Sequence, residues 1–169
     1  KHGFIKKGDA LIEFNNLKKD PLLEDYENAK TLLSKMYFLS FHAEYYEALR
    51  EHENRLIYNE QLIELFEKNT TIKKTRTDRY LNALFNYLNN LLELKKYPKF
   101  QKEVSKLKNL KLAPYEYELK KKKERAYIFL HLNYYDATSQ IDKALEEIVP
   151  RVEKYFSKSN GLVNKLIEG

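Results

Sequence analysis

Lysines recur along one stretch of the sequence at a spacing that could contact nucleic acid. Lys95, Lys99, Lys102 and Lys106 follow one another at intervals of four, three and four residues, which places them on one side of an α-helix. Residues 95–125 carry twelve Lys or Arg against four Glu, a net charge of +8 in a chain of net charge +6. Such a basic stripe could contact the phosphates of RNA or DNA. A solvated, lysine-rich helix face would show the same pattern.

Residue types that support catalysis or metal binding do not form any recognisable constellation. The chain has no Cys, which excludes disulfides, thiolate metal sites and cysteine nucleophiles. The four His are scattered, and the four Gly stand near the chain ends, so neither a metal-binding pair nor a phosphate-binding loop is present (His2, His42, His52 and His131; Gly3, Gly8, Gly161 and Gly169). We therefore expect a protein that is not an enzyme and that needs no metal and no cofactor.

The composition predicts an all-α protein. Of the 169 residues, 43% are hydrophobic and 33% are charged, which fits helices with one buried and one solvated face. Four Gly and four Pro leave little material for the turns of a large sheet. No apolar run approaches the roughly 20 residues that a membrane span requires, and we expect a cytoplasmic location.

The helices are predicted from the periodicity of apolar residues. In the centre of the chain, leucines at 81, 84, 88 and 91 mark one helix, the segment 94–98 marks a turn, and Phe100, Val104, Leu107 and Leu110 mark a second helix. Asp20 and Pro21 predict the start of a long helix, which would bend in the polar run 50–54. Residues 69–77 would form the longest break, with Thr77 or Asp78 capping the next helix.

A third helix pair is expected after Pro114. Its turn would lie near residues 133–136, and Pro150 would kink its second helix. The three pairs would span residues 21–68, 77–110 and 114–157, with a period of about 38–45 residues that is typical of helical solenoids. Because the chain begins without Met and a new apolar period starts near its end, we expect a piece of a longer protein.

The central pair resembles the tetratricopeptide-repeat (TPR) superfamily in a divergent bacterial form. The segment from Asn86 to Tyr97 is similar to the first helix of the family's motif, its turn and the Tyr that opens the second helix. Leu84 stands where the family usually has Trp, and Phe100 stands where it has a small Ala, which suggests a looser array. The resemblance implies a single domain of about three antiparallel helix pairs, wound into a right-handed α-α superhelix.

The same resemblance implies a peptide-binding groove lined by the first helix of each pair. In the central pair the corresponding residues are Asn82, Phe85 and Asn89. In the third pair they lie at the same helical spacing (Lys120, Lys123, Tyr127 and His131). Amides can hold a peptide backbone, and lysines can contact a carboxylate or a phosphate. Alternatively, these are simply surface residues beside a packed seam.

Three functional hypotheses follow from these patterns. The first is a noncatalytic scaffold that binds a protein or peptide on the concave face of the helical array. The second is a basic helical-repeat module that binds RNA or DNA. The third is a regulatory, peptide-sensing domain of a larger protein. The sequence favours the first hypothesis and does not identify a partner.

Overall fold

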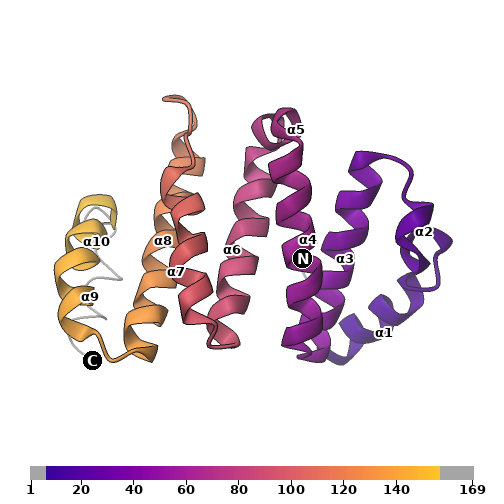
Figure 1. Cartoon of the computed structure of the whole chain (residues 1–169), viewed down its shortest axis with the longest axis horizontal. Helices are drawn as coiled ribbons and strands as arrows, with labels where there is room; N and C mark the ends of the chain where they lie inside the picture. The colour runs from indigo at the N-terminus through magenta and orange to yellow at the C-terminus, as the bar shows by residue number, and fades with distance from the viewer. Residues whose placement is uncertain (1–6, 157–169) are drawn as a thin grey trace. The chain divides into compact units, whose positions relative to one another are not determined.

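The computed structural model describes residues 7–156, and throughout this range the regular structure is helical, without β-strands (Figure 1). The chain divides into two compact units, one ending at Leu94 and the other beginning at Lys95. The expectation of an all-α protein is therefore confirmed. The expectation of a single repeat domain with pairs at 21–68, 77–110 and 114–157 stays a prediction. The last residue of the third expected pair lies outside the described residues.

The first unit is built on three long helices that pack in sequence order. Helix α3 (Leu32–Leu49) packs on α4 (His52–Lys68), and α4 packs on α6 (Thr77–Glu93), so that the three lie side by side (Figure 1). Helix α1 (Lys7–Leu17) and the single turn α2 (Pro21–Glu24) pack on α3, and the short 3₁₀ helix η1 (Tyr26–Asn28) follows α2. Helix α5 (Thr70–Thr75) contacts both α4 and α6.

The core of this unit contains one large residue from each long helix. Leu39 of α3, Phe66 of α4 and Tyr80 of α6 are at most 1% exposed. The rings of Phe66 and Tyr80 meet edge to face with centroids 5.4 Å apart. Burying side chains of this size contributes about 1.5–3 kcal/mol each, so contacts of this kind fix the helices against one another.

The bend between α3 and α4 is confirmed at the predicted position, although neither Gly nor Pro makes it. Arg50 adopts the left-handed conformation, with φ of 60°. Its N–H donates to the carbonyl of Glu47, and the N–H of Glu51 donates to the carbonyl of Tyr46. These two bonds form a Schellman motif, in which the left-handed residue, here Arg50, is usually Gly.

The second unit contains α7 (Tyr97–Asn109), α8 (Tyr117–Ala137), α9 (Ile141–Glu147) and α10 (Val149–Phe156). Helix α8 is the centre of the unit, because α7, α9 and α10 all pack on it. Phe100 of α7 stacks on Tyr134 of α8 with centroids 5.3 Å apart. Pro98 lies in the first turn of α7, which therefore begins inside the predicted turn at 94–98. As predicted, the regular helix is interrupted near Pro150, since α9 ends at Glu147 and α10 begins at Val149.

Two predictions about the first unit were wrong. Asp20 does cap a helix through the N–H of Leu22, but that helix ends after one turn, and the long helix begins only after Thr31. Thr31 and Ser34 form a reciprocal capping box there, which supplies the stronger start signal. The predicted break at 69–77 is mostly helical, because Thr75 and Thr77 bond to carbonyls of the preceding turn. Because α6 begins at Thr77, neither Thr77 nor Asp78 is its N-cap residue, and the N-cap residue Arg76 makes no side-chain cap bond.

In the second unit the predicted turn at 133–136 was also wrong. Helix α8 continues through these residues, because Tyr134 and Tyr135 are buried and their packing overrides the weak helix propensity of the segment. The helix ends at Ala137, and Ser139 then takes the left-handed conformation with φ of 55°. The N–H of Gln140 donates to the carbonyl of Tyr135 and closes the end of the helix.

Candidate functional site

A groove of about 300 Å³ runs over the three long helices of the first unit. Its floor is apolar and is formed by Met36, Ala43, Leu62, Phe66 and Ala83. Ala43 lies on α3 and Ala83 on α6, and their small side chains leave room over the residues of α4. Polar side chains complete the lining (Ser40, Glu44, Asn59, Arg79, Asn82 and Asn86). A hydrophobic floor with a few convergent polar groups is the usual character of a ligand site.

The polar groups of the groove come mainly from α3 and α6. The Nδ2 of Asn86 donates to Oε1 of Glu44 at 3.2 Å. The guanidinium of Arg79 donates to the hydroxyl of Tyr37 at 3.1 Å and lies 5.0 Å from the centre of its ring. Asn82 is exposed, and within the described part of the chain its amide makes no hydrogen bond. Asn82 therefore offers a donor and an acceptor to a ligand in the groove.

A buried polar chain connects the groove to the bend between α3 and α4. Asn59 and Asn90 are 2% and 0% exposed, and Nδ2 of Asn59 donates to Oδ1 of Asn90 at 3.3 Å. The Nδ2 of Asn90 in turn donates to the backbone carbonyl of His52 at 3.1 Å. Since buried amides are costly unless they are bonded, this chain fixes α4 and α6 in one register.

The bend itself holds an ionic cluster of Glu47, His52, Arg55 and Glu93. Arg55 is 5% exposed, and its Nη1 lies 2.7 Å from Oε2 of Glu47 and 2.9 Å from Oε2 of Glu93. The Nδ1 of His52 lies 3.3 Å from the same oxygen of Glu93. Glu47, His52 and Glu93 are residue types that bind metals, and their ligand atoms lie within 4.8 Å of one another. However, the guanidinium already supplies the positive charge between the two carboxylates, so the cluster fits an ion pair better than a metal site.

The groove includes only part of the face predicted on α6. Asn82 lines it, and the lining continues through Arg79 and Asn86. Phe85 is half-buried and is not part of the lining. Asn89 donates to Oε1 of Glu93 at 2.8 Å and so belongs to the ionic cluster.

The residues predicted on α8 lie in the second unit, and most of them have structural partners. The Nζ of Lys123 donates to the carbonyls of Lys108 and Leu110, at 2.9 and 2.8 Å, and thereby caps the end of α7. Burial lowers the pKa of Lys123. Lys120 donates to the carbonyl of Pro114 at 3.3 Å.

Tyr127 and His131 are buried and stack with centroids 3.9 Å apart. The Nδ1 of His131 is 2.9 Å from the carbonyl of Tyr127, so this nitrogen carries the proton of the neutral ring. Burial lowers the pKa of His131 and raises the pKa of Tyr127. Both residues are only 8% exposed, so little of either ring is accessible to a partner.

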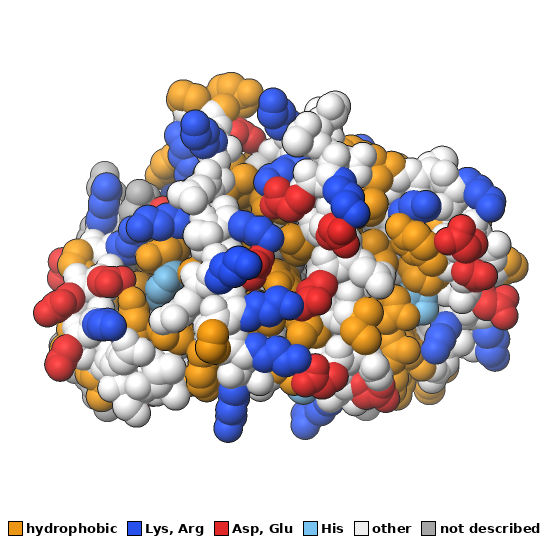
Figure 2. Space-filling model, viewed as in Figure 1, with side chains coloured by type: hydrophobic (Ala, Val, Ile, Leu, Met, Phe, Trp, Pro, Cys, Tyr) orange, Lys and Arg blue, Asp and Glu red, His pale blue; other side chains and the backbone are white. Residues whose placement is uncertain are grey.

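The basic stripe is shorter than its spacing suggests. Lys95 precedes α7 and adopts the left-handed conformation with φ of 54°, so it does not continue the helical row. Lys99 and Lys102 are exposed, and Lys106 pairs with Glu103 at 2.5 Å. On the face drawn in Figure 2, Lys and Arg side chains gather in a row near the middle of the view, with acidic side chains beside the row. The nucleic-acid hypothesis stays a prediction, and retention of RNA at low salt would test it.

The sequence alone missed several residues of the groove, above all Glu44, Arg79 and Asn86. A signal was present in the row formed by Arg79, Asn82 and Asn86, which recurs at helical spacing on α6. Glu44 has no such signal, because it comes from α3 and reaches the amide of Asn86 only through the packing of α3 and of α6 on α4.

Comparisons with protein-family models, with curated proteins and with solved structures found no match for this chain. The fold and the chemistry of the site therefore carry the functional argument. Among the described residues, none of the helices combines the length and apolar character that a bilayer-crossing helix needs.

Proposed function

We propose that this protein is a noncatalytic scaffold that binds an extended peptide segment of a partner protein in the groove over α3, α4 and α6. In this proposal the helices form a TPR-like array, with α3 and α6 as the first helices of successive pairs. The sequential packing of α3 on α4 and of α4 on α6 is consistent with that arrangement.

The observation that carries the proposal is the exposed amide of Asn82 at a groove with an apolar floor. An extended peptide presents a backbone N–H and a carbonyl at each residue, and one amide side chain can bond to both. The alanines Ala43 and Ala83 leave space for a side chain of the peptide above the buried Phe66. Glu44 and Arg79 add one charge of each sign, which favours a peptide of mixed polarity over a polyanion.

Selection from a library of random peptides tests this proposal and does not require that the partner be identified first. Peptides enriched on the wild-type protein are measured against Asn82→Ala and Asn86→Ala. Loss of one hydrogen bond costs about 0.5–1.5 kcal/mol, so we expect affinity to fall by roughly 2- to 12-fold in each variant. The matched control is Asn133→Ala, which removes an exposed amide from α8 in the second unit and should leave affinity unchanged.

Two outcomes would contradict the proposal. One is that no peptide is enriched on a correctly folded protein. The other is that the enriched peptides bind both groove variants as tightly as the wild type. Far-UV circular dichroism of each variant shows whether the helices are intact, so that a loss of binding is not confused with unfolding.

A further inference from the structure

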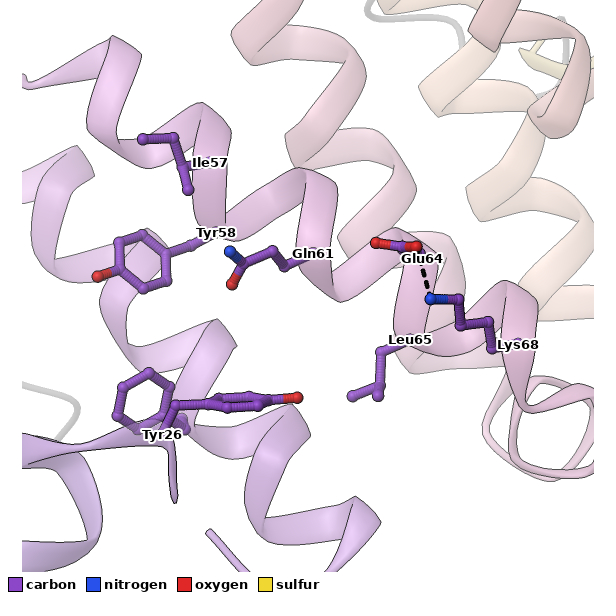
Figure 3. Close-up of a pocket in the computed structure, with 8 residues that line it drawn as sticks. Tyr26, Ile57, Tyr58, Gln61, Glu64, Leu65 and Lys68 are labelled. Carbon is purple, nitrogen blue, oxygen red and sulfur yellow. Dashed lines mark ion pairs between the residues drawn. The ribbon is translucent and has the colours of Figure 1, made fainter. Parts of the chain in front are cut away.

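A second cavity, of about 420 Å³, lies elsewhere in the first unit and has a different chemistry. Its walls are the rings of Tyr26, Phe38 and Tyr58, which come from η1, α3 and α4 respectively. Figure 3 shows Tyr58 and Gln61 on one side of an open space and Tyr26 and Leu65 on the other. The volume lies within the usual range for small-ligand sites.

The aromatic walls are held in place by further rings behind them. Phe38 is buried and meets the ring of Tyr26 edge to face, with centroids 5.5 Å apart. Tyr58 stacks on His42 at 4.9 Å and on Tyr46 at 5.5 Å, with interplanar angles of 17° and 19°. Because the walls are already ordered, binding a ligand would not carry the entropic cost of arranging them.

The charges around the cavity favour an uncharged ligand. Glu64 and Lys68 both line it, and they neutralise each other in an ion pair of 2.7 Å (Figure 3). The ammonium of Lys35 lies 4.9 Å from the centre of the Tyr26 ring, so this ring already has a cation partner and a second cation would be repelled. The amide of Gln61 and the hydroxyls of Tyr26 and Tyr58 are the neutral polar groups of the lining, and the amide can both donate and accept.

We infer that this cavity, which we call the aromatic pocket, binds an uncharged aromatic ring that carries one hydrogen-bonding group, such as indole. The ring would lie among Tyr26, Phe38 and Tyr58, and the hydrogen-bonding group would meet the amide of Gln61. Offset and edge-to-face contacts between rings stabilise such an arrangement beyond the burial of apolar area. The aromatic pocket is separate from the peptide groove, with which it shares no lining residue.

The absence of Trp from the sequence gives a direct assay. Indole is excited at 295 nm in the presence of increasing protein, and its emission reports binding without a tryptophan background. We expect saturable binding with a blue shift, which Tyr26→Ala weakens at least tenfold by removing one wall. No saturable binding to the folded wild-type protein would overturn the inference.

The hydrogen bond to Gln61 is tested with a pair of probes and a pair of proteins. We expect the wild type to bind indole about 3- to 10-fold more tightly than 1-methylindole, which has no N–H. In Gln61→Leu this preference should disappear, while Asn133→Ala on α8 should keep it. An unchanged preference in Gln61→Leu would contradict the assigned position of the ligand.

Two further probes identify the source and the charge of the ligand. If the ring belongs to a tryptophan side chain of a partner, N-acetyl-tryptophanamide should bind at least as tightly as indole. If it belongs to a free small molecule, indole should bind and the larger N-acetyl-tryptophanamide should not. Both results support a binding site for an aromatic ring. Tighter binding of tetramethylammonium than of indole would show a cation cage and would overturn the inference. Failure of the peptide selection at the groove would leave this result unaffected.

Discussion

Replacing Arg55 by Met should destabilise the first unit more than the loss of an exposed charge such as Lys68. Arg55 is 5% exposed and contacts Glu47 and Glu93 at 2.7 and 2.9 Å. Methionine keeps much of the apolar stem but leaves two carboxylates facing each other without their cation. Removing one partner of a buried pair costs about 3–5 kcal/mol. The two carboxylates are partly exposed, with 40% and 29% of their side chains accessible, so we expect the lower end, about 3 kcal/mol.

Urea unfolding followed by circular dichroism measures this effect. With a typical m value of about 2 kcal/mol per M, the midpoint should fall by about 1.5 M. The triple variant Arg55→Met, Glu47→Gln, Glu93→Gln should recover about 1–2 kcal/mol, because it also removes the repulsion between the carboxylates. The matched control is Lys68→Met, which breaks the exposed pair with Glu64 and should cost less than about 0.5 kcal/mol.

The reasoning would be refuted by a loss below about 1 kcal/mol in Arg55→Met, which is the value of a surface pair. It would also be refuted if the triple variant were less stable than Arg55→Met alone. In that case the carboxylates would stabilise the bend through contacts other than the guanidinium.

Three further predictions concern protons, packing and backbone strain. Burial lowers the pKa of His42 and of His131 below 6.5, so these groups bind more protons in the unfolded chain than in the folded one. The free energy of unfolding should therefore fall as pH drops below about 6.5 and level off below the folded pKa values. NMR titration midpoints at or above 6.5 would contradict this. Phe66→Ala should cost about 3–5 kcal/mol in urea unfolding. Tyr80→Phe keeps the buried ring and loses the hydrogen bond to Glu67, so it should cost about 1 kcal/mol. Arg50→Gly should raise stability by about 0.5 kcal/mol by relieving a left-handed residue, and Arg50→Ala should bring no such gain.

The sequence predicted the helices and several of their ends because these features depend on local chemistry. Apolar periodicity identified α6 and α7, and α7 begins at Tyr97, one residue before Pro98. Pro150 interrupts its helix because it has no backbone N–H and its ring crowds the preceding turn. The polar run after Leu49 marked the bend, although the residue that makes it, Arg50, has low intrinsic preference for a left-handed conformation.

The errors arose where two local signals competed or where packing decided. Asp20 and Thr31 are both good caps, and only the reciprocal bond with Ser34 distinguishes the start of the longer helix. The threonines of α5 predicted a break, but their hydroxyls can also bond within a helix. Tyr134 lies in a segment with weak helix propensity, and its contacts with α7 keep α8 helical there.

The candidate sites were harder to predict because their residues come from distant parts of the chain. Asn82 was found from the spacing on its own helix, whereas Glu44 reaches the groove from α3. Arg55 was not singled out, since a lone Arg in a polar run is usually exposed. Its burial follows from two carboxylates that stand 8 residues before it and 38 residues after it.

The sequence of α4 nevertheless contains a signal for both proposed sites. A helix with one apolar face packs on one neighbour, but α4 carries apolar residues in two rows, one with Phe66 and one with Tyr58 and Leu65. The row with Phe66 forms part of the peptide groove, and the row with Tyr58 lines the aromatic pocket. Two apolar rows on a helix of 17 residues therefore predict a helix that lies between two neighbouring helices and has an apolar surface toward each side. The packing of α4 on both α3 and α6 is the structural result of that pattern.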